Sequence, residues 1–554
     1  MYKSLDNEII ALWKDLSPSG AYILGWNEYA GRLFIPSEQN LKGAIERVRA
    51  LRRRAENDVQ AKVLDSIEVT LLFAEPQPVL DDIVGAIFAH LTKEGINEKH
   101  MASLLSDASK SIDATQRRFR AVKVPVAVKA LTLYRLDGII EILDSVKKAT
   151  KSKALKKDCD RLTEKARKFV ALFQLEGFGK GTFEEVERVF KKYKFDLGRE
   201  KFYRLAIEAG FDYSETPDEL ERNALSWIDE ELPKYHDVVR RLAEHYECAA
   251  TPDAVEKKVV ERQRLNPGQL LRVTNSFRKA IQEFTNESVV RINPSYKTRV
   301  IETPPFLSGV LPTGAAQFFD TFTKKPFQLY YLTTDPKRDP AKSVSQLINL
   351  LVHEEYGHCV HHSNSAFRFG GKASDLELLP TLLSGPITEG LSFNRESEFL
   401  EASLALERKK GLTAAERKYV SVLEKHGGLH LVNMELELET RKWRLIRFLR
   451  VIGDVRINTN KQGLFEFIDW AHKHTGVPRS NVYYQLFPAH EGMFPGYATA
   501  YAVVGEEIRG IEEKLSDRKK KVKFSTYLTG MGFPPRSIYR KRLENFAAGL
   551  NSET

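Results

Sequence analysis

Residues 347–358 read Leu-Ile-Asn-Leu-Leu-Val-His-Glu-Glu-Tyr-Gly-His. The first six residues are nearly all apolar, which predicts a helix that is buried on most sides. The polar residues from His353 to His358 continue this helix, and burying them is costly unless they have partners. A bound metal ion is the partner that this pattern favours, although a polar cluster with a purely structural role is the alternative.

The two histidines of this segment have an unusual spacing for a metal site. Two imidazoles on one helical turn, with a glutamate beside the first, supply two zinc ligands and a general base. His353 and His358 would be the ligands and Glu354 the base, but the histidines are five residues apart instead of four. At about 100° per residue an ideal helix would turn His358 away. We therefore expect a single-residue bulge, which Gly357 would allow at low cost.

A catalytic zinc ion needs a third protein ligand, and the best candidate lies in the next predicted helix. Residues 386–396 read Pro-Ile-Thr-Glu-Gly-Leu-Ser-Phe-Asn-Arg-Glu, with Glu389 in the first turn. Glu396 lies two turns later on the same face, where it could orient a ligand histidine. The pattern alone does not single out Glu389 among the many glutamates. His361 and His362 are interpreted as residues around the site, and Cys359 as a small buried residue.

A last group of candidates is found in residues 494–501, Phe-Pro-Gly-Tyr-Ala-Thr-Ala-Tyr. Pro and Gly would start a helix in which Tyr497 and Tyr501 share a face. A phenol can donate a hydrogen bond to the oxyanion of a tetrahedral intermediate. Two tyrosines packed in a core are the simpler interpretation, and His490 is a weaker candidate for the same role.

The order of patterns predicts a mainly α protein with one small sheet. Helical periodicity runs from residue 5 to about 284, and β-favouring segments bounded by Gly, Pro and Asp follow at 288–292, 298–302, 314–319 and 327–332. We therefore divide the chain into a helical N-terminal region, 1–286, and a catalytic region, 287–554. The latter would contain a sheet at about 288–333, a metal-binding helix at about 343–362 and further helices.

Composition excludes several classes of protein. Charged residues make up 29% and hydrophobic residues 42%, a balance typical of globular proteins. The net charge of +10 comes without a nucleic-acid-binding motif, so we expect basic side chains on solvated helix faces and no nucleic-acid partner. No apolar run is long enough to cross a membrane. The three separated cysteines and the polar N-terminus favour the reducing cytosol.

The motifs resemble those of known metallopeptidases. His353 to His358 resembles the HExxGH motif of dipeptidyl peptidase III. Over more of the chain, the sequence is similar to a large, mostly bacterial family of metallopeptidases known only as a domain of unknown function. That family carries HExxPGH, EGWAxYxE and PGQAxxY segments, which correspond in order to residues 353–358, 389–396 and 495–501 here. Residues 450–454 resemble its Arg-x-x-x-Asp run. The last segment also resembles the thimet oligopeptidase and neurolysin family.

These resemblances imply a gluzincin-like helical peptidase with a deep channel between two helical halves. They imply that Glu389 is a metal ligand and that Tyr501, with Tyr497, faces the substrate. The chain departs from the family pattern at Leu391, Asn394 and Tyr497, and it lacks the motif proline. These departures leave the substrate preference open.

The sequence as a whole predicts a peptidase with one Zn²⁺ per chain that hydrolyses oligopeptides, of carboxypeptidase or oligopeptidase type. A zinc hydrolase of a non-peptide amide or ester is one alternative. A basic helical binding protein that retains a structural metal site is the other. The sequence indicates neither the substrate nor the oligomeric state.

Overall fold

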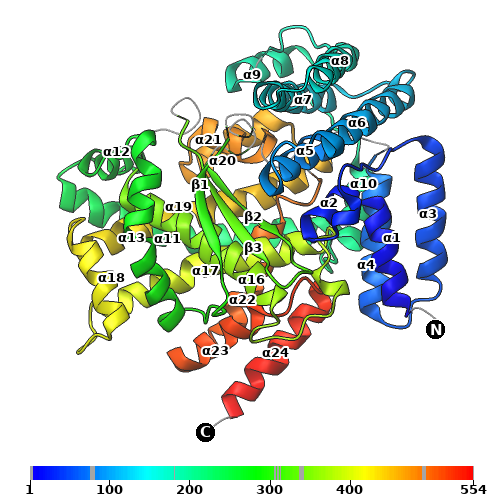
Figure 1. Ribbon diagram of the computed structural model, residues 1–554. Helices are drawn as coiled ribbons and strands as arrows, with labels where there is room; N and C mark the ends of the chain where they lie inside the picture. The colour runs from blue at the N-terminus through cyan, green and yellow to red at the C-terminus, as the bar shows by residue number, and fades with distance from the viewer. Residues whose placement is uncertain are drawn as a thin grey trace.

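The computed structural model describes residues 4–74, 81–179, 181–304, 307, 311, 313–335, 342–488 and 494–552. Helices dominate these residues, and a small mixed sheet immediately precedes the helix that carries the histidines (Figure 1). The predicted mainly α fold is therefore confirmed. Figure 1 shows the N-terminal helices α1–α4 at one side of the molecule and the C-terminal helices α23 and α24 below the sheet.

The N-terminal part of the chain is helical. Its helices begin at good capping residues: Thr216, for example, accepts a hydrogen bond from the backbone of Glu219 and starts the longest of them. The helices are α1 (Leu5–Leu16), α2 (Pro18–Leu24), α3 (Glu38–Arg52), α4 (Asp58–Leu72), α5 (Asp81–Lys93), α6 (Glu98–Phe119), α7 (Val126–Ala149), α8 (Lys153–Val170), α9 (Phe183–Lys192), α10 (Glu200–Leu205), α11 (Pro217–Tyr246), α12 (Pro252–Arg262) and α13 (Pro267–Ser288), with short 3₁₀ or π turns at Asn27–Tyr29, Ala171–Phe173 and Ala206–Gly210.

One proline lies inside a helix without ending it. Pro233 falls within α11, which continues through it to Tyr246. A proline inside a helix removes one hydrogen bond and costs about 3 kcal/mol. Helix α11 packs along the equally long α19 (Leu429–Asn458), and this contact offsets the cost.

Three of the four predicted strands form the sheet. They are β1 (Thr298–Glu302), β2 (Gly314–Phe319) and β3 (Phe327–Leu332). The order is β1-β3-β2, with β3 parallel to β1 and antiparallel to β2. Strand β2 is therefore one edge of the sheet.

The fourth predicted strand, 288–292, is wrong. Helix α13 continues to Ser288, and the chain then runs as an irregular buried segment. Its backbone is satisfied by side chains instead of a neighbouring strand: the N–H of Arg291 donates to Oγ1 of Thr526, and that of Ile292 to Oδ1 of Asn286. Apolar β-branched residues thus fill the core here without pairing.

The chain after the sheet is again helical. Ser343 caps the first helix together with Gln346, so this helix starts where the sequence predicted. The helices are α15 (Val344–Leu351), the π-helical segment η4 (Val352–Cys359), α16 (Val360–Ala366), α17 (Ser384–Leu406), α18 (Ala414–Glu424), α19, α20 (Leu464–Thr475), α21 (Arg479–Leu486), α22 (Ala500–Glu512), α23 (Arg518–Thr529) and α24 (Arg536–Ser552), with a 3₁₀ turn at Leu376–Leu378.

A buried ion-pair network joins α11 to α19. Glu231 of α11 is 3% exposed, and it accepts hydrogen bonds from Arg441 Nη1 at 2.8 Å and from Arg444 Nε at 3.0 Å. Burial by itself would raise the pKa of Glu231, but Arg444 and Arg441 outweigh it and lower that pKa. The carboxylate therefore fastens the N-terminal helices to the helix that crosses the centre of the protein.

We expect Glu231→Gln to lower the free energy of unfolding by about 3 kcal/mol, because it leaves the buried guanidinium of Arg444 and the partly buried one of Arg441 short of a partner. Chemical denaturation followed by circular dichroism measures this. Because the folded pKa is depressed, the contribution is complete above the unfolded pKa of about 4.3 and disappears as the pH falls through the folded pKa. Wild type and variant should therefore converge in acid. Glu230→Gln, on the exposed side of α11, is the control.

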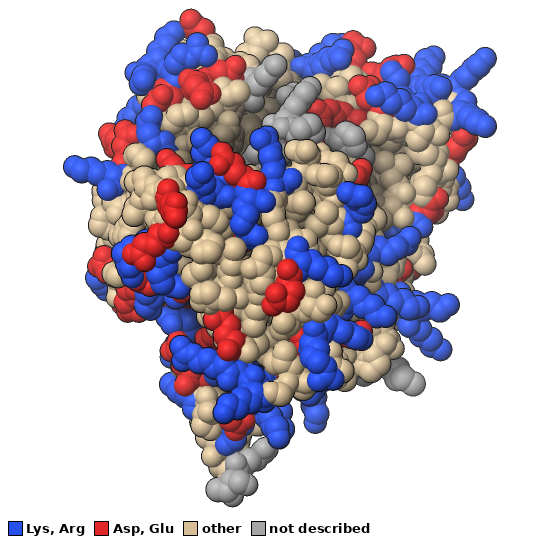
Figure 2. Space-filling view, turned by 90° about the vertical axis from the view of Figure 1, so that its left-hand side faces the viewer, with Lys and Arg blue, Asp and Glu red and all other residues tan. Residues whose placement is uncertain are grey.

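The surface carries its charge in a mixed pattern. Figure 2 shows Lys and Arg side chains spread over the visible face, with Asp and Glu interspersed among them. The visible face therefore carries charges of both signs. In the part of the chain that the structure describes, no helix combines the length and the apolar character needed to span a bilayer.

Candidate metal centre

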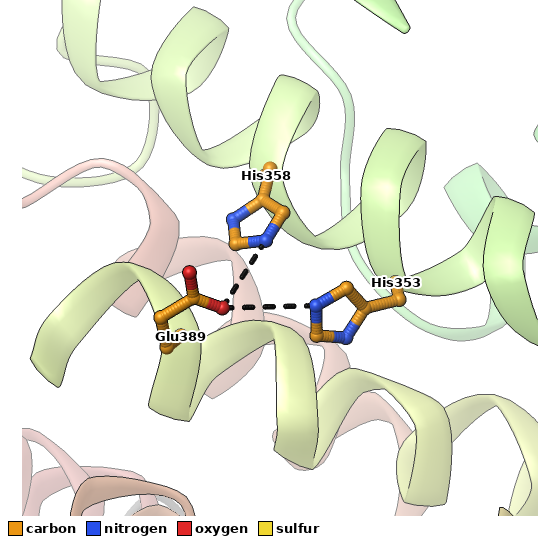
Figure 3. Close-up of side chains that lie close together, drawn as sticks. All are labelled: His353, His358 and Glu389. Atoms are coloured by element: carbon orange, nitrogen blue, oxygen red, sulfur yellow. Dashed lines mark ion pairs between the residues drawn. The ribbon is translucent and has the colours of Figure 1, made fainter. Parts of the chain in front are cut away.

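The π-helical segment η4 brings the two histidines onto one face. In this geometry residue i bonds to residue i+5, so side chains five apart align, as residues four apart do in an α-helix. The rings of His353 and His358 have centroids 4.8 Å apart, and both point toward the same place (Figure 3). The predicted distortion is present, but it extends over Val352–Cys359 instead of a single residue at Gly357.

Gly357 has a different role from the one predicted. Its backbone needs no conformation reserved for glycine. A Cβ at this position would instead lie 2.4 Å from Oγ, 2.7 Å from Cβ and 2.9 Å from Cα of Ser392. Glycine is therefore required by the close approach of α17, the helix that supplies the third ligand candidate.

We expect Gly357→Ala to weaken zinc binding by about 10- to 100-fold, the cost typical of disturbing residues that support metal ligands. The new methyl group must push α17 away from η4. Competition with a chelator measures the zinc affinity. Gly510→Ala is the matched control, because a Cβ on that helical glycine meets nothing within 4 Å. An unchanged affinity in Gly357→Ala would show that α17 can shift without moving Glu389.

Glu389 of α17 completes the group. Its Oε2 lies 3.4 Å from Nε2 of His358 and 3.7 Å from Nε2 of His353, and all three residues are buried. Burial would raise the pKa of Glu389, but the two histidines hold that pKa well below its ordinary value. Glu389 of α17 is thus an anion that lies beside the two imidazoles of η4.

The other ring nitrogen of each histidine is already engaged. Nδ1 of His353 lies 2.7 Å from Oε1 of Glu396, and Nδ1 of His358 lies 3.1 Å from Oγ of Ser392. Arg447 in turn donates to both Glu396 oxygens, at 3.0 and 2.7 Å. Such contacts fix the ring orientation and leave Nε2 available to a metal. Burial would lower the pKa of His353, but the nearby carboxylates of Glu389 and Glu396 raise it to about 9.

These residues fit a zinc ion. Oε2 of Glu389 is buried without a hydrogen-bond partner, which is unusual for a carboxylate oxygen. The three ligand atoms lie within 4.8 Å of one another. Two imidazoles and one carboxylate are a donor set typical of catalytic zinc, which leaves a fourth position open. The buried group of His353, His358 and Glu389 could therefore hold a metal ion.

The two glutamates after His353 face different surroundings. Glu354 lines a cavity beside the ligand candidates, and within the described residues no hydrogen bond or ion pair engages its carboxylate. Burial raises the pKa of Glu354, which His358 and His353 partly oppose. Glu355 is instead held by Arg278 at 2.6 Å and by the hydroxyl of Tyr296 at 3.2 Å. Of these two glutamates, Glu354 is thus the one whose carboxylate is available to act as a base.

The two predicted tyrosines also reach the group. Tyr497 donates a hydrogen bond to Oε1 of Glu389 at 2.6 Å, and the Tyr501 ring lies 6.4 Å from the His353 ring. Burial raises the pKa of both phenols, so both remain donors. The predicted helix start at Pro495 is wrong: α22 begins at Ala500, and Tyr497 lies in the preceding turn. His490 lies outside the described residues.

Sequence reasoning assigned no role to the residues of α19 that support this site. Asp454 accepts from the N–H of Gly496 at 3.2 Å and from Oγ1 of Thr499 at 2.7 Å, so it holds the turn that carries Tyr497. Arg450 lines the cavity, and burial lowers its pKa to about 10, so it stays charged at neutral pH. The available signal was the set of charges at 447, 450 and 454 within an apolar run.

The cavity beside the group has a volume of about 460 Å³. Residues from η4, α17, α19, the turn before α22 and the edge strand β2 line it, and so does Phe211 from the N-terminal region. His362 lies at the wall, stacked on Phe318, while Nε2 of His361 is 3.2 Å from the carbonyl oxygen of Gly532. A larger cleft of about 730 Å³ lies away from the histidines, and its charged side chains are largely paired with one another.

Comparisons with known proteins find solved structures with a similar fold but no matching family or curated protein. No protein-family model matches the sequence, and no curated protein matches it. Two solved structures, each described as a "putative lipoprotein", match nearly the whole chain. The one from Colwellia psychrerythraea has a TM-score of 0.68 and 14% identity over 99% of this chain and 98% of its own. The one from Shewanella oneidensis, described as of unknown function, has a TM-score of 0.66 and 16% identity over 97% and 98%.

The chain shares its fold with both. Identities this low establish the fold alone, and no enzyme family is identified by them. The metallopeptidase resemblance of the motifs and the cytosolic location therefore stay predictions.

Proposed function

We propose that this chain is a zinc-dependent peptidase that hydrolyses oligopeptides. One observation carries the proposal: the group of His353, His358 and Glu389 shares a cavity with the unengaged carboxylate of Glu354. A structural zinc site is closed by four protein ligands, whereas a catalytic site keeps one position open. In the described residues this group offers three ligands and a base beside them.

A zinc ion held by these three residues would supply a Lewis acid that acidifies water and polarises a carbonyl group. Glu354 would take the proton of the attacking water and deliver it to the leaving amine. The hydroxyl of Tyr501 would donate a hydrogen bond to the oxygen that becomes negative in the transition state. Tyr497 would orient the Glu389 carboxylate through the hydrogen bond described above.

The edge strand β2 supports a peptide as the substrate. Residues Gly314, Ala315 and Ala316 of β2 line the cavity, and their small side chains let another chain approach. An extended peptide can add to such an edge through main-chain hydrogen bonds. The volume of about 460 Å³ suits a short stretch of peptide more than a folded protein.

Zinc-loaded protein incubated with a peptide library tests the proposal. We expect about one zinc per chain, cleavage products that carry new termini, and loss of cleavage after treatment with a chelator. Cleavage of esters or non-peptide amides without peptide cleavage would favour the hydrolase alternative. Zinc binding with no hydrolysis of any kind would favour the binding protein. Far less than one zinc per chain would contradict a metal site altogether.

A further inference from the structure

Helix α19 places two buried arginines in the cavity wall, and among the described residues only one of the two forms an ion pair. Arg447 is paired with both oxygens of Glu396. Arg450 is 6% exposed and lines the same cavity, yet it forms no ion pair with a carboxylate in the described part of the chain. A buried charge without a counter-charge is costly, and proteins normally pair it.

The contacts of Arg450 fix its position but leave it able to bind a ligand. Nη2 donates to Oε1 of Gln485, and the guanidinium lies 4.7 Å from the centroid of the Tyr501 ring. Nε is buried without a hydrogen-bond partner. The side chain is therefore held in place by a neutral amide and an aromatic face, and neither of these groups carries a negative charge.

We propose, resting on the proposed function, that Arg450 binds a carboxylate of the substrate beside the bond to be cleaved. Arginine presents a planar fork of donors that matches a carboxylate. Peptides with a free C-terminal carboxylate are then the preferred substrate class, and the enzyme removes one residue or a short fragment from that end.

The position of Tyr501 indicates how far Arg450 lies from the ligand histidine His353. Its ring lies 6.4 Å from the ring of His353 and 4.7 Å from the guanidinium of Arg450, so it stands beside both. The two distances together set an upper limit on the separation between the guanidinium and the ligand histidine. About three residues of extended peptide, at about 3.3–3.6 Å each, can span that separation. A carboxylate on Arg450 thus belongs to a residue close to the cleaved bond.

The competing role for Arg450 is support of Tyr501 alone. A guanidinium over a phenol ring is itself a favourable contact. In that case loss of Arg450 would slow all substrates equally, whether or not they carry a carboxylate. Selectivity between substrates, and not overall rate, therefore separates the two roles.

Three peptides test the proposal: a free acid, its C-terminal amide, and the same amide with its last residue replaced by glutamate. We expect wild type to favour the free acid over the amide by about 10- to 100-fold in kcat/KM, the value of a charge-assisted hydrogen bond. In Arg450→Gln this ratio should fall to about one. Arg456→Gln, on the same helix but bonded to Glu221 outside the cavity, should keep the wild-type ratio. A preference for the glutamate amide over the free acid would assign the site to acidic side chains instead.

Binding to the zinc-loaded Glu354→Gln protein gives a readout that needs no cleavage. The free acid should bind about 10- to 100-fold more tightly than the amide, and adding Arg450→Gln should remove the difference. A preference that persists without Arg450 would overturn the proposal. An Arg450-dependent preference in binding, with no cleavage by wild type, would leave the carboxylate site standing and contradict the peptidase.

Discussion

Glu354→Gln is expected to lower kcat for peptide cleavage by about 10²- to 10⁴-fold, the contribution of a positioned general base. The amide has nearly the shape of the carboxylate but cannot accept the proton of the attacking water. Steady-state kinetics on a peptide cleaved by wild type measures the loss. The expected KM is close to that of wild type, because Glu354 would act on the water and not hold the peptide.

Zinc retention makes this result specific to catalysis. The imidazoles of His353 and His358 and the carboxylate of Glu389 are untouched by the change, so about one zinc per chain should remain. Glu355→Gln provides the contrast within the motif. It removes the buried partner of Arg278 and should lower stability, by about 3 kcal/mol, more than it lowers kcat. Full activity of Glu354→Gln would overturn the assigned mechanism.

Local sequence chemistry predicted the parts of the fold that short-range rules control. The helix start at Ser343 follows from a cap that Ser343 and Gln346 complete between them. The three strands of the sheet follow from β-favouring runs bounded by Gly, Pro and Asp. The predicted strand at 288–292 failed because a buried apolar run need not pair when Thr526 and Asn286 satisfy its backbone. Thr526 is more than 200 residues away, and no local pattern reveals it.

The candidate site was predictable to the same extent. The histidine spacing indicated a distorted helix, and Glu389 and Glu396 follow at one face of the next helix. The sequence did not show why position 357 requires glycine, because the requirement comes from the close approach of Ser392 on another helix. Arg450 and Asp454 were noted only as part of a family-like run, since charges on a helix normally indicate a solvated face. Helix α19 is instead buried along most of its length, which only tertiary structure shows.

Glu389→Ala is expected to lower zinc affinity by more than the 10- to 100-fold cost of losing a supporting residue, because it removes a ligand outright. It also leaves the Tyr497 hydroxyl without its acceptor at 2.6 Å. Tyr497→Phe isolates that second effect and should cost at most about 10-fold. Zinc affinity measured against a chelator compares the variants.

A control variant and one contrary outcome determine what the zinc affinity of Glu389→Ala shows. Glu401→Gln, an exposed glutamate on the same helix that pairs with Lys521, should bind zinc as wild type does. If Glu389→Ala also kept the wild-type affinity, the metal would have its ligands elsewhere. The orphaned Oε2 of Glu389 argues against that outcome: a buried carboxylate oxygen 3.4 and 3.7 Å from two imidazole nitrogens has no other partner in the described chain, and a cation between the three would satisfy all of them at once.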